Sequence, residues 1–526
     1  MDCNQILVTG SGDPARDFID LNSAIAACQD RGGGAIYVQG DFNIAKDIHF
    51  LGRWNSPQFV PVSLIGVPGG RARFLLAPGV QLLWDAMFEL SRGPQWHPIT
   101  SIESNTFRWA DPQDRPAVLN RGDVLVFKSD DEIKGMPLHA YGYKHLSLEA
   151  HTYDDSNGDE LVTDSHFEDP MVTNPMGALM PMVQGVQIKD ITICSNGEYS
   201  DGYGVVLTQL QGGVIDRVRF GDDELQGPGG VYWKNNTDTV MSHCTWSENQ
   251  NYEGAFGYGN VMAMCTNCRI ENSLVRFTRH PMTTGNTWFN GGSKERRGTS
   301  LNCVFQNNHV IHAARKNGMT CFDTHPEGCG IVVRNNLFEL LGNEQVLAIN
   351  CRSRKMVVES NVFRSNGLRA KGGNVSADGC VIRNNVLDGF WYGWATTPSV
   401  GYAAKDITFA HNDYYRIGGE GLIINGGSDI HVFDELFASC GGDPRGRKPA
   451  CIKVAGSKPS GLTIEGCNMS RRVGICAVWA DHGPEVVSHC RGNQMYGYGA
   501  GRIGVAGSKA AAWEAEFARD NFTDTL

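Results

Sequence analysis

The chain has 526 residues, of which 64 are glycine and 20% are charged, and its formal net charge at pH 7 is −11. The glycine content is well above the ~7% of average proteins, and the composition is too apolar for a disordered chain. The negative charge argues against nonspecific nucleic-acid binding, and the sequence has no apolar run long enough for a helix inserted in a membrane.

The first predicted element is an amphipathic helix near the N-terminus. Residues 15–31 place an apolar stripe on one face, formed by Phe18, Leu21, Ala24, Ile25 and Cys28. Glycines at 32–34 end the helix, and the apolar residues 35–38 begin a strand. We interpret this region as a cap helix followed by the first coil of a β-helix. The N-terminus lacks the basic and then apolar pattern of a secretory signal peptide, so we expect none.

Residues 100–184 do not follow the repeat of the regions around them. The segments 122–128 and 145–151 have the pattern of strands outside that repeat, so we predict a β-rich insertion. The predicted boundaries are 1–45 for the N-terminal segment, cap helix and first coil, 46–99 for early coils, 100–184 for the insertion, 185–498 for the main β-helix and 499–526 for a C-terminal tail.

From residue 185 onward, short strand-like segments recur about every 27 residues. Their period-two alternation and their Val and Ile content are typical of strands, and stacked coils bury a core that one coil cannot bury alone. The sequence therefore predicts an all-β chain folded as a right-handed parallel β-helix. The central apolar position of successive coils is placed at Ile215, Met241, Ile270, Phe305, Val333, Val358, Ile382, Phe409, Val432, Ile464 and Ser488.

Five consecutive repeats carry Asn three residues after the central position. These residues are Asn308, Asn336, Asn361, Asn385 and Asn412. Stacked coils lie about 4.8 Å apart, and identical amides at that spacing can hydrogen-bond along the stack. We predict an asparagine ladder with a structural role.

The 16 cysteines are scattered through strand-like runs, which indicates core packing in a protein made in a reducing compartment. Cys265 and Cys268 have the spacing of metal ligands, but a structural zinc site needs four ligands. No metal site is predicted.

An unusual group of ionisable residues follows a predicted strand. Asp323, His325 and Glu327 fall within five residues, and the preceding coil carries Arg279 and His280. Because neighbouring coils are about 4.8 Å apart, such groups can meet on one face. A purely structural alternative is that Asp323 and His325 order a turn and pair with Arg279.

Two carboxyl groups hydrolyse a glycosidic bond when they lie ~5–5.5 Å apart for retention or ~6.5–9.5 Å apart for inversion. Carboxylates one or two coils apart meet that requirement, and the preferred pair is Asp323 with Glu327 or Glu344. His325 is also a catalytic candidate, since it can tune proton transfer.

β-Elimination on a uronic acid is a second reaction for the same surface. It needs a base and a cation that neutralises the sugar carboxylate, and the candidates are Arg279, His280, Arg352 and Lys234. No run has the EF-hand pattern, so no cofactor is predicted, and Ca²⁺ is expected only if the protein is a lyase.

Aromatic side chains are candidates for stacking on sugar rings. They are Trp288 and the cluster Trp391, Tyr392 and Trp394. For the cluster, packing against a second subunit is the alternative.

Three segments carry a family resemblance: residues 32–38 after the helix, Arg279 and His280, and 322–328 with their Asp, His and Glu. They resemble the β-helical tailspikes and polysaccharide depolymerases of bacteriophages, within the pectate-lyase-like superfamily. The resemblance implies that a bacterial surface polysaccharide is bound and depolymerised by a homotrimer on a virion tail, after synthesis in the host cytoplasm. Hydrolysis is favoured over elimination. A non-enzymatic spike or adhesin and a cellular β-helix lyase or epimerase remain as alternatives.

Overall fold

The computed structural model describes residues 5–523 except for a set of short segments. Those segments are 52–59, 86–94, 134–145, 198–202, 248–256, 286–297, 314–319, 343–344, 368, 399–402, 442–449, 472–475, 483–485, 497–502 and 506–520. The chain forms two compact units. The first comprises Met1–Lys134, Gly142–Val304 and Glu327–Cys329, and the second comprises Gly135–Tyr141, Phe305–Pro326 and Gly330–Leu526.

The N-terminal helix of the first unit is confirmed as α1 (Pro14–Asp30). The Asp13 carboxylate accepts two backbone N–H groups of the first turn, which satisfies donors that a helix start leaves open. Leu21 and Ile25 on the apolar stripe are buried, as the sequence predicts. The adjoining strand β2 (Gly34–Ile44) pairs in parallel with the next coils, so the helix lies at the first coil.

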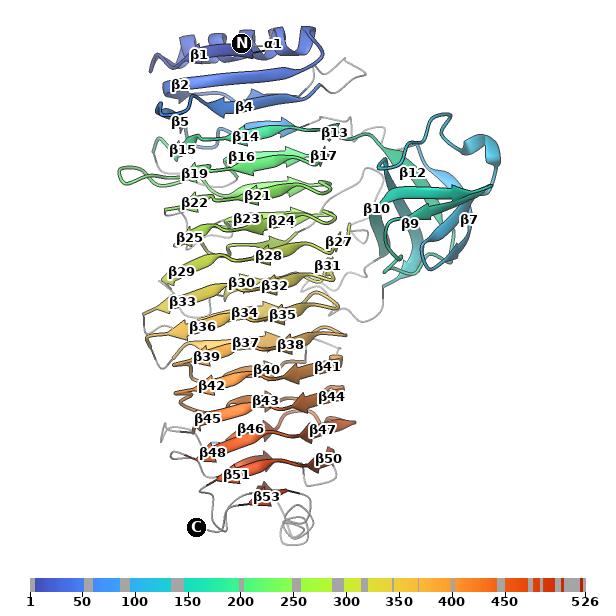
Figure 1. The fold of residues 1–526 in the computed structure, drawn as a ribbon, viewed down its shortest axis with the longest axis vertical. Coiled ribbons are helices and arrows are strands. Elements are labelled where there is room, and N and C mark those ends of the chain that lie inside the picture. Colours follow the sequence, from blue (N-terminus) through green and yellow to red (C-terminus); the bar gives the residue numbers. More distant parts are fainter. Residues whose placement is uncertain are drawn as a thin grey trace. The chain divides into compact units, whose positions relative to one another are not determined.

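The coils of the first unit are parallel strands in register from one coil to the next (Figure 1). Ile215, Met241 and Ile270 are directly paired, which confirms this part of the predicted core column. A separate column, which we call the β20 sheet, carries side chains discussed below. Its strands are β3 (Ile48–His49), β6 (Leu82–Asp85), β16 (Val205–Thr208), β20 (Val231–Lys234), β23 (Asn260–Ala263) and β26 (Thr283–Thr284).

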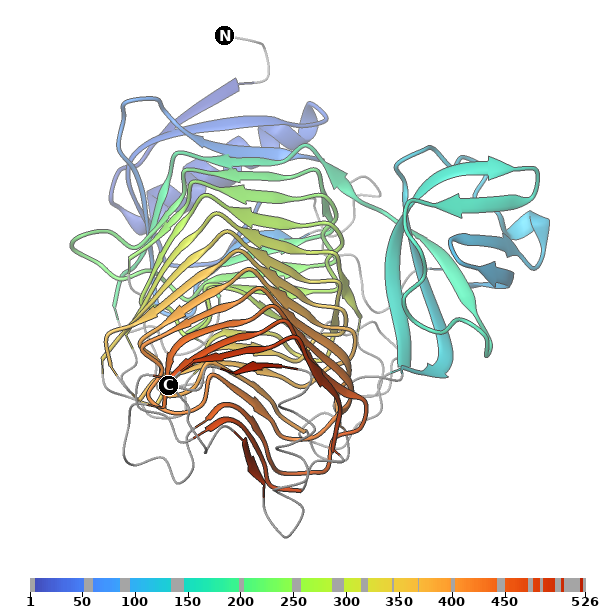
Figure 2. The same cartoon turned by 60° about the horizontal axis from the view of Figure 1, so that its bottom comes forward.

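A closed barrel of antiparallel pairings also belongs to the first unit (Figure 2). Phe107, Phe127 and Leu161 form part of its apolar interior. Its strands are β7 (His97–Glu103), β8 (Thr106–Trp109), β9 (Val124–Glu132), β10 (Leu146–Asn157), β11 (Glu160–Thr163) and β12 (Met176–Met180).

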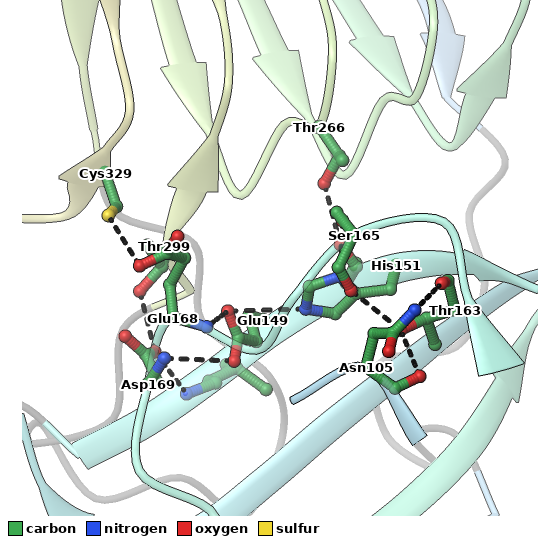
Figure 3. A network of polar contacts seen from close by, with 12 residues as sticks. Asn105, Glu149, His151, Thr163, Ser165, Glu168, Asp169, Thr266, Thr299 and Cys329 are labelled. Atoms are coloured by element: carbon green, nitrogen blue, oxygen red, sulfur yellow. Dashed lines mark hydrogen bonds and ion pairs between the residues drawn. The ribbon is translucent and has the colours of Figure 1, made fainter. Parts of the chain in front are cut away.

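Polar side chains join the barrel to the coil turns of the same unit (Figure 3). The Thr266 hydroxyl donates to the carbonyl of Ala150 (2.9 Å), and the Thr299 hydroxyl donates to the Asp169 carboxylate (3.0 Å). The loop that carries Asp169 is held from the barrel side by the buried Glu149, which accepts its backbone N–H (3.1 Å). One loop therefore makes contacts to both the barrel and the coils.

The second unit is likewise a stack of parallel coils, and the fold is a parallel β-solenoid as the sequence predicts. We call one of its columns the β34 sheet. Its strands are β30 (Thr320–Asp323), β34 (Leu347–Cys351), β37 (Lys371–Val375), β40 (Trp394–Thr396), β43 (Leu422–Ile424), β46 (Ala450–Val454), β49 (Cys476–Ala480) and β52 (Ile503–Val505).

The predicted core column is paired through Val333, Val358, Ile382, Phe409, Val432 and Ile464. Its last position is wrong, because Ile464 pairs with Cys490 and not with Ser488. The register shifts between Leu462 and Thr463, and this irregularity displaces the pattern that identifies the position.

The asparagine ladder is confirmed. The amide nitrogen of Asn336 donates to the amide oxygen of Asn361 (2.9 Å), and Asn361 donates in the same way to Asn385 (3.0 Å). Asn385 repeats the bond to Asn412 (2.9 Å), and Asn412 donates to the carboxylate of Glu435 (2.9 Å). The ladder thus continues into a residue that sequence analysis does not include.

The fifteen cysteines in the described residues are all free, and fourteen of them are buried. This agrees with the predicted packing role. No helix in the described part of the chain is both long and apolar enough to cross a membrane.

Candidate functional site

The sequence-predicted residues Asp323, His325 and Arg352 lie together in the second unit. Asp323 is the last residue of β30, one coil away from β34, and Arg352 directly follows β34. The Arg352 guanidinium contacts both carboxylate oxygens of Asp323, with Nε 3.2 Å from Oδ1 and Nη2 2.5 Å from Oδ2. His325 Nε2 is 3.9 Å from the same Oδ2. The expectation that stacking brings distant charges together is met for Asp323 and Arg352.

The backbone between these side chains is fixed by Thr324. Its buried hydroxyl accepts the backbone N–H of Arg352 (2.9 Å) and that of Ser353 (3.2 Å). Arg352 Nε also donates to the Thr324 carbonyl (2.8 Å). The Asp323 side chain is only 8% exposed, whereas that of Arg352 is 32% exposed. Solvent therefore reaches the pair mainly from the side of the guanidinium.

Further polar side chains continue along the β34 sheet. Lys371 and Tyr392 are on adjacent coils, and the Lys371 ammonium is 5.9 Å from the centre of the Tyr392 ring. The Tyr392 hydroxyl donates to Asn374 (3.0 Å), and burial raises its pKa to about 12. Glu420 and Lys453 form an ion pair of 3.3 Å. Of this set, only Tyr392 is among the candidates predicted from the sequence.

The remaining predicted site residues are placed differently. Glu327 is buried in the first unit, and its carbonyl accepts the N–H of Ser300 (2.8 Å). Arg279 and His280 also belong to the first unit. Glu344 and Trp288 lie outside the described residues. The pairing of Asp323 with Glu327 or Glu344 stays a prediction.

Arg279 and His280 contact a tyrosine that sequence analysis missed. The His280 ring stacks on Tyr258 with centroids 5.0 Å apart, and the Arg279 guanidinium is 5.2 Å from the same ring. His280 itself is 2% exposed. Tyr203 and Tyr232 stack at 4.9 Å in the same unit. Their spacing in the sequence matches the coil repeat, which is the signal that identifies them.

The tryptophan cluster divides between surface and core. Trp394 is fully buried, with its ring edge against Phe363 (6.0 Å). It therefore contacts neither sugar nor a second subunit, because β40 turns it toward the inside of the coil. Trp391 and Tyr392 are partly exposed. Among the described residues, no three His, Cys, Asp or Glu side chains converge on a metal-binding position.

No protein family model matches the sequence, and no curated protein matches it. Solved structures do match its fold. The tailspike gp61 of Pseudomonas phage phi297 is 13% identical, with 94% of this chain and 76% of that chain covered and a TM-score of 0.57. The Gp54 tailspike of Acinetobacter baumannii bacteriophage AP22, in complex with A. baumannii capsular saccharide, is 12% identical, with 96% and 76% covered and a TM-score of 0.50. At these identities the likeness concerns the fold.

Proposed function

We propose that this chain is a phage tailspike-like protein that binds and depolymerises a bacterial surface polysaccharide. The observation that carries the proposal is the cluster of Asp323, Arg352 and His325 on a fold shared with two phage tailspikes. One of those tailspikes is in complex with a capsular saccharide. The resemblance of residues 322–328 to tailspike segments supports the same function.

Glycoside hydrolysis is the favoured reaction. Arg352 stabilises the ionised form of Asp323 through a two-point contact, and the ionised carboxylate is the form that a base or nucleophile requires. Glu327 or Glu344 is then the proposed proton donor, since the reaction uses a second carboxyl group. His325 lies close enough to Asp323 to influence the proton transfer.

Elimination on a uronic acid is the second candidate reaction, because cations are available on both units. Arg352 and Lys371 are partly exposed in the second unit, and Lys234 and Arg279 are partly exposed in the first. Ca²⁺ belongs to the proposal only in this case. Assembly as a homotrimer and attachment to a virion tail are further parts of the proposal and rest on the resemblance.

The experiment is the cleavage of capsular or O-antigen polysaccharide by wild-type protein and by Asp323→Asn. New reducing ends alone indicate hydrolysis, and reducing ends with ultraviolet absorbance of an unsaturated product indicate elimination. We expect Asp323→Asn to lose turnover and to keep binding. Asp388→Asn is the control, because Asp388 pairs with Arg416 on another column of the same unit. Full turnover in Asp323→Asn removes Asp323 from the mechanism, and binding without cleavage by the wild type favours an adhesin.

A further inference from the structure

The outer face of the β20 sheet carries an acid, a hydroxyl and an ammonium group in one register. Asp85, Thr208 and Lys234 are directly paired across three successive coils, with Thr208 in the middle. The residues before them, Trp84, Leu207 and Trp233, are completely buried in the core. Side chains of a strand alternate between its two faces, so the three polar groups point away from the core.

Thr208 has a hydrogen-bonding capacity that the described residues do not use. The residue is 4% exposed, and its Oγ1 has no hydrogen-bond partner among the residues that the structure describes. A buried hydroxyl without a hydrogen-bond partner carries a cost in stability. A polar group of a ligand that enters between Asp85 and Lys234 would remove this cost.

Lys234 presents a half-buried positive charge to the same place. Burial lowers the pKa of Lys234, and the negative charge of Asp85 partly opposes that effect. Within the described part of the chain, Lys234 forms no ion pair within 4.0 Å. Such an ammonium group favours an anionic ligand, because a buried charge is stabilised by a partner of opposite sign.

Tyr232 forms an aromatic wall beside these groups. It lies two residues before Lys234 on β20 and therefore shares its face. Its ring stacks on Tyr203, and burial raises the pKa of Tyr232 to about 12. The Tyr232 hydroxyl thus stays protonated at neutral pH and can donate a hydrogen bond.

We propose that Lys234, Thr208, Asp85 and Tyr232 form a binding site for a sugar that carries one carboxylate, a hexuronate unit. Lys234 takes the carboxylate, Thr208 and Asp85 bind ring hydroxyls, and Tyr232 lines the edge. A single ammonium with Asp85 nearby suits a singly charged ligand with hydroxyl groups better than a doubly charged phosphate. The inference names a sugar class for the proposed polysaccharide function, and its biological role rests on that function.

The experiment measures binding of free glucuronate and galacturonate by saturation-transfer NMR, with glucose and galactose as neutral probes. The wild type is compared with Lys234→Met, Thr208→Val and the control Lys189→Met, which removes a lysine from β14 (Gln187–Lys189) of the same unit. We expect the wild type and Lys189→Met to prefer a hexuronate over its neutral counterpart. Lys234→Met should lose about tenfold in hexuronate affinity and Thr208→Val a smaller factor, because a charge-assisted hydrogen bond exceeds a neutral one.

Each outcome decides the inference. Unchanged hexuronate affinity in Lys234→Met, or no hexuronate binding by the wild type, overturns it. If the protein cleaves polysaccharide in a way that depends on Asp323 but binds no hexuronate, the proposed function stands and this binding site is removed. Hexuronate binding that depends on Lys234, in a protein that cleaves no polysaccharide, keeps the site and removes the proposed depolymerase. Circular dichroism of both variants confirms that they are folded.

Discussion

Glu435 occupies a ladder position that carries Asn in the five coils before it. One of its oxygens accepts the backbone and side-chain N–H groups of Asn412 (3.2 and 2.9 Å), and the side chain is completely buried. Burial raises the pKa of Glu435 to about 8, while the neighbouring Tyr414 hydroxyl and the hydrogen bonds from Asn412 oppose the shift. At neutral pH the folded protein therefore holds Glu435 mostly protonated, as a neutral analogue of the amide.

We expect stability to fall with rising pH because of Glu435. Its unfolded pKa is ~4.3, so at intermediate pH the folded state binds a proton that the unfolded state lacks. The stabilisation is fully present below ~4.3 and is lost as pH rises toward the folded value of about 8. Glu435→Gln should remove this decline, measured as apparent melting temperature against pH. Glu465→Gln, on a partly exposed ion pair with Arg491, is the control, and identical pH profiles for Glu435→Gln and wild type would contradict the assignment.

Side-chain position was predictable where the coil register alone decides it. Asp323 and Arg352 meet because their strands are adjacent, and that adjacency follows from the repeat. The contacts of Thr208 and Lys371 were not predictable, because they depend on how deeply each side chain is buried and on neighbours one coil away. The burial of Trp394 was not predictable either, because neighbouring aromatic residues in a sequence can face the core or the solvent.

At the scale of the element, the ladder joins coils whose strands are as short as three residues, such as β35 (Val357–Glu359) and β38 (Val381–Arg383). Asn361 donates to the carbonyl of Val333 (2.9 Å) and to Asn385, and it accepts from the backbone and side chain of Asn336. One side chain therefore connects three successive coils. Because these groups are buried, water cannot replace the bonds that a substitution removes.

Asn361→Ala should destabilise the protein by about 3 kcal/mol, since it leaves several buried donors and acceptors without partners. The measurement is the denaturant midpoint of the second unit's unfolding transition. Ser360→Ala is the control. The neighbouring Ser360 is exposed, and its positive φ of 56° is similarly strained for serine and for alanine, since both carry a Cβ. Its effect should stay within about 0.5 kcal/mol. Equal midpoints for the two variants would show that the ladder does not stabilise the coils.

The repeat predicted the coil columns well, since every coil repeats the same core position. It failed at Ser488, where the register shift after Leu462 adds an irregularity that spacing alone does not reveal. The closed barrel at β7–β12 has no repeat, and its pairing by antiparallel strands with bulges depends on contacts distant in sequence. The loop that joins it to Thr299 was for the same reason not predictable.

At the scale of the whole molecule, the burial of the cysteines shows how completely the coils exclude solvent. Fourteen of the fifteen described cysteines are buried, and Cys490 is partly exposed. Burial raises the pKa of Cys321, Cys351 and Cys380, so little reactive thiolate is present at neutral pH. Thiol reactivity is therefore expected to depend on unfolding and to differ little among the buried positions.

Native protein should therefore react with a thiol reagent first at Cys490, and slowly, because burial raises the pKa of this partly exposed thiol as well. Cys3 lies outside the described residues. All 16 cysteines should react after unfolding in guanidinium. The measurement is thiol titration by absorbance with peptide mapping of the labelled sites, and Cys490→Ser should remove the first of the described thiols to react. Rapid labelling of Cys321 or Cys351 in the native protein would mean that the coils open to solvent without global unfolding, because both lie inside the stack.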